Sequence, residues 1–131
     1  MPIDESRFRQ AMGHFASGVT VVTTETEGHQ YGMTVSSFAS LSLRPPLILI
    51  CIDKTVPTHG AIAEAGRFVV NILEEHQEHL SRRFSVTDND KFRGVAWHTG
   101  WLGLPVLDNA LAVIECRLAT TVERGDRRAD S

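Results

Sequence analysis

The sequence predicts a mainly β protein: a small antiparallel β-barrel with a few short helices. Several short segments are rich in Val, Ile and Thr and are separated by Gly, Pro, Asp and Asn, which is the composition of strands and turns. The chain has 131 residues, of which 42% are hydrophobic and 22% are charged, enough to bury one core. We therefore expect residues 1–131 to form a single domain.

The first expected elements are a helix and a β-hairpin. A helix is predicted over residues 4–15, where apolar side chains recur at helical spacing after Asp4. Residues 18–24, GVTVVTT, are rich in β-branched side chains, as strands are. The turn residues 27–29, EGH, separate them from a second strand that begins near Gln30.

A hydroxyl-rich segment follows over residues 32–46, GMTVSSFASLSLRPP. Gly32 leaves room for a ligand or another backbone, and Pro45 and Pro46 end the strand because they cannot donate to a ladder. The segment is nearly uncharged, and its hydroxyl side chains are Thr34, Ser36, Ser37, Ser40 and Ser42. Neutral donors of this kind suit the carbonyl and nitrogen edge of a flavin ring. The alternative is an ordinary strand whose polar face meets water.

Next comes a continuous apolar run, LILICI, at residues 47–52. A strand of this composition needs cover on both faces, from the barrel interior on one side and a partner subunit on the other. Neither Cys51 in this run nor Cys116 near the end of the chain belongs to a CxxC motif. Both are expected to be buried free thiols.

Polarity then changes abruptly at residues 53–59, DKTVPTH. Thr58 is expected to cap a short helix that runs through residues 61–64 and stops at Gly66. The charge of Lys54, a hydroxyl and the free N–H groups of a helix start together suit a phosphate. The alternative is a solvated loop in which Thr58 does no more than cap the helix.

The remaining elements are two strands, a helix and a long excursion. Residues 67–73, RFVVNIL, and residues 111–118, where apolar side chains alternate, are predicted strands. Residues 75–84 are predicted to be helical, with two arginines in the last turn. Residues 85–109 carry dispersed Phe and Trp, so we expect an ordered excursion rather than a polar linker.

Several function classes are excluded by composition and spacing. The net charge of −3 and the lack of a Lys/Arg run argue against nucleic-acid binding. No apolar run approaches the roughly 20 residues that span a bilayer, and the N-terminus is charged, so we expect a soluble, cytoplasmic protein without membrane contact. His76 and His79 have no third metal ligand at a recognisable spacing. The sequence contains neither a nucleophile elbow nor a GxGxxG fingerprint.

Five segments taken together carry a family resemblance. They are FRQAMGHFASGVTVVTT (8–24), GMTVSSFASLSLRPPLILICIDKTVPTH (32–59), GRFVVNIL (66–73), RRF (82–84) and FRGVAWHTGWLGLPVLDNALAVIECRL (92–118). In this order they closely resemble the flavin reductase-like family, the short-chain reductases of two-component flavin monooxygenases. No single segment would be specific enough, but the combination is, and the resemblance extends over about residues 8 to 126.

The resemblance implies a split β-barrel, usually a homodimer, that binds FMN or FAD without a Rossmann unit. By similarity, the flavin ring edge and ribityl chain would lie along the hydroxyl-rich segment, and the ribityl chain and phosphate near the loop after LILICI. The implied flavin-binding residues are Thr34, Val35, Ser36, Ser37, Ser40, Cys51, Ile52, Asp53, Lys54, Thr58, His59, Arg83 and Phe84.

The family's reaction is hydride transfer from NADH or NADPH to the flavin, and the reduced flavin then diffuses to an oxygenase partner. Such a transfer needs the nicotinamide and the flavin held in stacking distance, with no acid or base of unusual pKa. This implied chemistry agrees with the lack of a recognisable catalytic triad, and no catalytic residue is assigned.

The sequence departs from the family near its end. Relatives continue through a Gly-Asp-His motif into further strands, whereas this chain reads Gly125, Asp126, Arg127 and ends in RRADS. We expect weakened flavin binding and impaired turnover, unless a dimer partner covers the strand edge that would otherwise be exposed. Two other functions stay open: a flavin- or haem-binding module without reductase activity, and a flavoenzyme that keeps its flavin and reduces another acceptor.

Overall fold

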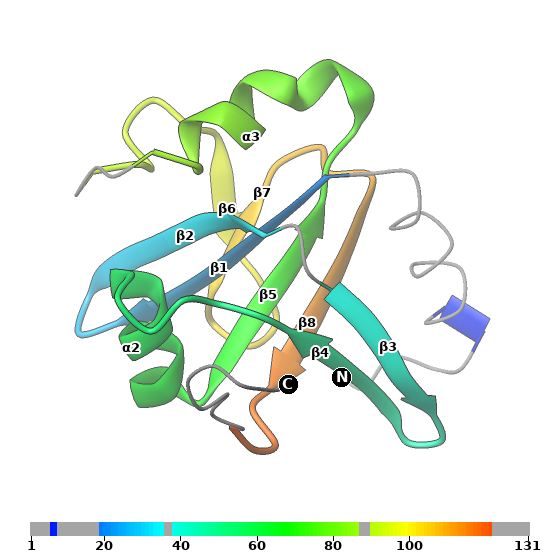
Figure 1. The fold of residues 1–131 in the computed structure, drawn as a ribbon. Coiled ribbons are helices and arrows are strands. Elements are labelled where there is room, and N and C mark those ends of the chain that lie inside the picture. Colours follow the sequence, from blue (N-terminus) through cyan, green and yellow to red (C-terminus); the bar gives the residue numbers. More distant parts are fainter. Residues whose placement is uncertain (1–5, 8–18, 36–37, 87–89, 122–131) are drawn as a thin grey trace.

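The fold is built from three antiparallel sheets and a few short helices (Figure 1). The computed structural model describes residues 6–7, 19–35, 38–86 and 90–121. In chain order the elements are β1 (Thr20–Thr26), β2 (His29–Val35), β3 (Phe38–Leu43), β4 (Pro46–Ile50), α2 (Pro57–Ala65), β5 (Arg67–Ile72), the 3-10 helix η1 (Glu75–Gln77), α3 (Glu78–Arg83), β6 (Trp97–Thr99), β7 (Pro105–Leu107) and β8 (Ala112–Arg117).

The main sheet has four strands in the order β2-β1-β5-β8, and β3–β4 and β6–β7 form separate hairpins. All the strand pairs are antiparallel. Figure 1 shows the β3–β4 hairpin extending away from the main sheet, with α3 above the sheet and α2 beside β1 and β2. The predicted mainly β, antiparallel class is confirmed. Most of the helix expected over residues 4–15 lies outside the described residues.

The β1–β2 hairpin follows from its turn residues. Glu27 and Gly28 both have positive φ, 53° and 78°, as the tight turn favoured by the twist of a hairpin requires. This turn sets the register in which Thr26 pairs with His29 and Thr20 pairs with Val35. The predicted turn at EGH is therefore confirmed.

Alternation along β1 separates two apolar clusters. Val22 faces a cluster that includes Val35, Ile62, Phe68, Val70, Ile72 and Ile114, with Ile48, Ile50 and Ile52 packed against it. Val21 faces a second cluster with Leu73, Phe84, Phe92 and Leu107. The sheet is thus covered on both faces, and β4 contributes its inward side chains to the first cluster.

A buried amide connects three strands. Asn71, fully buried on β5, donates through Nδ2 to the Val21 carbonyl at 2.9 Å and to Thr23 Oγ1 at 3.0 Å. Its Oδ1 accepts the Leu107 N–H at 2.9 Å. Thr23 in turn donates to the Pro105 carbonyl at 2.7 Å. Asn71 therefore satisfies buried polar groups of both β1 and β7 from its place on β5.

The start of α2 differs from the prediction. The helix begins at Pro57, its N-cap is Val56, and no side chain caps it. Thr58 lies inside the first turn and is 3% exposed, so its predicted capping role is wrong. Proline suits the first helical position because its φ is already helical and its missing N–H is not needed there. Gly66, with φ 72°, ends the helix as expected.

The two cysteines have different environments. Cys51 is exposed because it continues the outward face of Leu47 and Leu49, while Ile50 and Ile52 on either side of it pack inward, so the prediction of a buried thiol is wrong for Cys51. Cys116 lies on β8 against the first apolar cluster. Burial, and secondarily the charge of Glu115, raises the pKa of the Cys116 thiol to about 12.

We expect Cys116 to be unreactive in the folded protein. A Cys51→Ser variant, in which Cys116 is the remaining thiol, should react with a chromogenic disulfide reagent at pH 8 at least ~100-fold more slowly than the denatured chain, because the reactive thiolate is scarce. Stopped-flow absorbance measures both rates. Equal rates before and after denaturation would contradict the burial of Cys116.

The excursion after α3 is ordered where it is described. Phe92 contacts Phe84 and Trp97 edge-to-face, at centroid distances of 5.1 and 5.8 Å. The short β6–β7 hairpin follows, and Trp101 at its tip is exposed. No helix among the described residues has the length and apolar character needed to cross a membrane.

Candidate functional site

The candidate site lies where β2 ends. Val35, the last residue of β2, belongs to the same apolar cluster as Ile52, which follows β4, and Ile62 of α2. The folding of the chain thus brings the hydroxyl-rich segment and the end of LILICI into one cluster, and the loop from Asp53 to Val56 leads on from there. Thr58, buried in the first turn of α2, completes this side of the site.

The other side of the site is the end of α3. Thr34 donates its N–H to the Phe84 carbonyl at 3.1 Å and its hydroxyl to the Ser81 carbonyl at 2.6 Å. The last carbonyls of a helix have no partner within the helix. Thr34 therefore satisfies the end of α3 and fastens the end of β2 to it. Both of its donors are committed to these contacts.

Phe84 contributes its backbone rather than its ring. The ring is fully buried in the second apolar cluster, where it packs against Phe92. Gly32 on β2 lies directly beside it, and a Cβ on Gly32 would be 2.8 Å from two ring carbons of Phe84. The glycine is needed here because strand and ring approach this closely.

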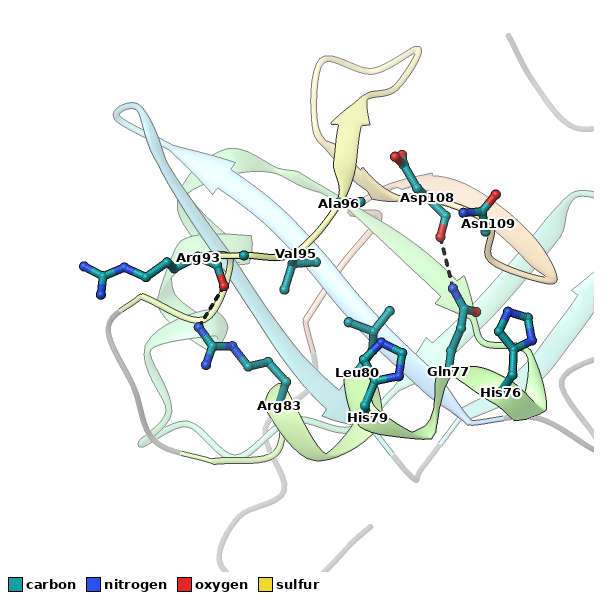
Figure 2. A pocket seen from close by; sticks show the side chains of 11 residues that line it. His76, Gln77, His79, Leu80, Arg83, Arg93, Val95, Ala96, Asp108 and Asn109 are labelled. Atoms are coloured by element: carbon teal, nitrogen blue, oxygen red, sulfur yellow. Dashed lines mark hydrogen bonds between the residues drawn. The ribbon is translucent and has the colours of Figure 1, made fainter.

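Arg83 holds a neighbouring loop. Its Nε donates to the Lys91 carbonyl at 2.8 Å, and its Nη2 donates to the carbonyls of Asp90 and Arg93 at 2.9 and 3.1 Å. Figure 2 shows the contact with Arg93. The planar guanidinium suits several fixed acceptors at once. In the structure, the Arg83 side chain binds backbone carbonyls of this loop. Its contact with a flavin, which the family resemblance implies, stays a prediction.

Lys91, on the loop that Arg83 holds, donates in turn to β2 and to the end of α3. Its ammonium donates to the carbonyl of Gly32 at 3.0 Å and to the carbonyl of Phe84 at 3.2 Å. These carbonyls belong to β2 and to the end of α3. Sequence reasoning did not identify Lys91 or Ser81 as part of the site, because their partners are far away along the chain and no local motif marks them.

A short acidic turn shapes the loop between β4 and α2. Asp53 Oδ1 accepts the Thr55 N–H at 2.9 Å and the Thr55 hydroxyl at 2.8 Å, and the Asp53 carbonyl accepts the Val56 N–H at 3.2 Å. The two Thr55 donors, the backbone N–H first, lower the pKa of the Asp53 carboxyl, which is therefore ionised near neutral pH. This turn leads from the exposed Lys54 into the first turn of α2.

Of the remaining residues that the resemblance implied, those that the structure describes make no hydrogen bond to the end of β2. Cys51 and Ser40 are exposed, and Ser40 lies on β3, in the separate hairpin. His59, in the first turn of α2, is half-buried. Ser36 and Ser37, the residues between β2 and β3, lie outside the described residues.

A separate cavity of about 510 Å³ lies beside α3 (Figure 2). It is lined by η1 and α3 on one side and by residues 93–96 and 108–109 on the other. Gln77 Nε2 bridges the two walls by donating to the Asp108 carbonyl at 3.0 Å. The cavity shares only Arg83 with the predicted flavin residues, so it is not the cleft that the sequence predicted.

The residues at the end of β2 fit a flavin in their chemistry. The loop after β4 offers a cation in Lys54 beside the start of α2, where the helix dipole is positive, and both suit a phosphate. The Asp53 carboxylate, the acid of this loop, is directed at Thr55.

Comparison with known proteins places this arrangement in context. The model of the flavin reductase like domain family matches residues 12–128. The reductase subunit HsaB of a flavin-dependent monooxygenase from Rhodococcus jostii (strain RHA1) is 44% identical over 124 residues. That match covers 95% of this chain and 64% of the relative, so the chain spans just under two thirds of the relative's length.

Solved structures agree with these matches. Nitrilotriacetate monooxygenase component B from Mycobacterium thermoresistibile is 40% identical, with a TM-score of 0.79 over 92% of this chain and 70% of that one. NADH:FAD oxidoreductase SgcE6 of Streptomyces globisporus C-1027, in complex with NAD and FAD fragments, is 34% identical, with a TM-score of 0.77 over 96% of this chain and 79% of that one. The predicted antiparallel split β-barrel is confirmed, and the chain belongs to the flavin reductase like domain family.

Proposed function

We propose that this chain binds a flavin, FMN or FAD, at the end of β2 and serves in the transfer of a hydride to it from NADH or NADPH. The observation that carries the proposal is that Val35 at the end of β2, Ile52 after β4 and Ile62 of α2 belong to one apolar cluster, which brings these three elements together. The names of the relatives support it, because one is a reductase subunit and another is an NADH:FAD oxidoreductase.

The protein's contribution is placement. Thr34, tied to α3, secures the strand from which the hydroxyl-rich segment continues. The Asp53 turn carries Lys54 just before the start of α2, where a phosphate would meet a cation and the positive end of the helix dipole. When bound, the flavin supplies the hydride acceptor. The side chains need only hold the two rings together and exclude water.

The reduced flavin is proposed to leave for a separate monooxygenase component. The Rhodococcus relative is itself a reductase subunit of a flavin-dependent monooxygenase, which supports this assignment. The titration described next separates this proposal from a flavoenzyme that retains its flavin.

The decisive experiment is a flavin titration followed by an NADH oxidation assay. Flavin fluorescence should be quenched on addition of the protein, and absorbance at 340 nm should then fall with NADH only when free FMN or FAD is added. NADH oxidation without added flavin would favour the flavoenzyme with a retained flavin. Flavin binding without NADH oxidation would favour the flavin-binding module, and no quenching would contradict both.

A homodimer is proposed through the β3–β4 hairpin. Leu41, Leu47 and Leu49 are 62%, 39% and 43% exposed, while Ile48 and Ile50, on the opposite face of β4, pack on the core. An apolar sheet face of this kind requires cover. A second copy of this hairpin would supply apolar side chains to match it.

We expect light scattering after size exclusion to give a dimer for the unmodified chain. The double substitution Leu47→Lys and Leu49→Lys should give a monomer, because two charges would have to be buried in the interface. Val86→Lys is the matched control, since Val86 is 52% exposed and lies after α3, away from the hairpin. A monomeric unmodified chain, or a dimer that survives the double substitution, would rule out this interface.

A further inference from the structure

Two cations join three segments around Thr34 in a reciprocal arrangement. Arg83 donates to the carbonyls of the loop that carries Lys91. Lys91 donates back to the carbonyl of Phe84, the residue after Arg83, and to the carbonyl of Gly32 on β2. We call these two side chains with their carbonyl partners the Arg83–Lys91 clamp.

The clamp and Thr34 share an acceptor. The Phe84 carbonyl accepts the Thr34 N–H at 3.1 Å and the Lys91 ammonium at 3.2 Å. The Gly32 carbonyl, which also accepts from Lys91, lies on the same strand two residues before Thr34. Lys91 therefore links β2 to the end of α3 beside the hydrogen bond from Thr34 to Phe84. Removing the Lys91 ammonium would leave that hydrogen bond without the neighbouring link.

The chemistry of these contacts makes them stronger than ordinary backbone hydrogen bonds. Each donor is ionised, and hydrogen bonds from an ionised donor are about twice as strong as neutral ones. Arg83 and Lys91 are half-buried, so water competes for the carbonyls only partly. The ring of Phe84 cannot shift to compensate, because it is fully buried against Gly32 and Phe92.

We propose that Lys91 and Arg83 are positioning residues of the flavin site, which act through the backbone of Phe84 and Gly32 to fix Thr34 and the end of β2. The proposal rests on the proposed function, since it presumes that flavin binds where β2 ends. It assigns Lys91 a role that no local motif indicated. It also gives Arg83 the role of holding the loop of residues 90–93 in place, rather than of binding an anionic ligand directly.

The first test measures positioning without any flavin. In the Lys91→Met variant, exchange of the Thr34 amide hydrogen, followed by NMR, should be at least ~10-fold faster than in the unmodified chain, because its acceptor loses the Lys91 contact. Exchange of the Val70 amide in the middle of the sheet should be unchanged. The Lys91→Arg variant, which keeps the charge and its donors, should restore most of the protection.

The second test measures flavin affinity. Lys91→Met and Arg83→Met should each raise the flavin dissociation constant about tenfold, as expected for the loss of a partly buried charged hydrogen bond. Arg93→Met is the matched control from the same loop. Its side chain is exposed and paired with Asp90, while the Arg93 carbonyl that Arg83 uses is kept. Its dissociation constant should stay within twofold of that of the unmodified chain.

The outcomes separate the clamp from the function. Thr34 exchange and flavin affinity that match the Arg93→Met control would overturn the proposal. Faster exchange of the Thr34 amide with unchanged flavin affinity would overturn the flavin-positioning role. Amide exchange that rises equally at Thr34 and Val70 would also overturn it, because it indicates general destabilisation. A chain that binds no flavin before any substitution would refute the proposed function, and with it the role of the clamp in that site.

Discussion

Replacing Asn71 by Leu is expected to lower the free energy of unfolding by about 3 kcal/mol. Leucine keeps the volume of the side chain but supplies neither donor nor acceptor. The Leu107 N–H would then lose its partner in the interior, the Val21 carbonyl and the Thr23 hydroxyl would lose a donor, and a buried polar group without a partner costs about 1–3 kcal/mol. Urea denaturation followed by circular dichroism measures the change.

Gln30→Leu is the matched control for Asn71→Leu. Gln30 lies on β2, and its amide makes a long, exposed contact of 3.4 Å with the Gly28 carbonyl. The same exchange of amide for isobutyl should change stability by less than about 0.5 kcal/mol there. Thr23→Val should lose less than Asn71→Leu, and the two changes should be non-additive because Thr23 and Asn71 are bonded to each other. Similar effects for Asn71→Leu and Gln30→Leu would contradict the buried connection.

Replacing Gly32 by Ala is expected to destabilise the protein by about 2 kcal/mol and to weaken flavin binding. The new methyl group would lie 2.8 Å from two ring carbons of Phe84 and 3.4 Å from Phe92. The Phe84 ring has no free space to move into, so strand or helix must shift. Because Thr34 is bonded to the Phe84 carbonyl, that shift would displace the end of β2. Thermal unfolding and flavin titration measure the two effects.

Gly60→Ala is a control with the opposite sign. Gly60 lies inside α2, and a Cβ there has no atom within 4 Å. Alanine should therefore stabilise the protein by about 0.5–1 kcal/mol through its better helix propensity. Phe84→Leu, combined with Gly32→Ala, should recover part of the lost stability by removing the ring carbons that clash. Equal effects of alanine at positions 32 and 60 would contradict the close approach of β2 to Phe84.

Much of the fold was predictable because its signals are local. The turn at EGH, the β-branched runs and the alternation along residues 111–118 correspond to the β1–β2 hairpin, β5 and β8. Gly66 ended α2 as its left-handed conformation allows. The predicted start of α2 was wrong. The helix begins at Pro57, one residue before Thr58, so Thr58 lies inside the first turn and is not the cap. The exposure of Cys51 was missed because an apolar run does not show that its outward side, with Leu47 and Leu49, is uncovered in the single chain.

The candidate site was predictable only in part. The pairing of the β2 end with the loop after β4 was implied by the family resemblance, and the shared cluster of Val35 and Ile52 agrees with it. The Asp53 turn is local, but its hydrogen bonds to Thr55 became visible only in the structure. The parts that no pattern indicated are contacts over long distances in the sequence, such as Lys91 to Gly32.

By itself, the sequence determined the antiparallel β class, the family and the positions of β1, β5 and β8 to within two residues, because strand alternation, turn residues and ordered segments are properties of neighbouring residues. Only the tertiary structure decided which donors are engaged at the site. Thr34 is committed to the carbonyls of α3, Phe84 is a core ring, and Arg83 and Lys91 bind backbone carbonyls. The physical reason is that a hydrogen bond depends on distance and direction in space, and the spacing of residues along the chain specifies neither.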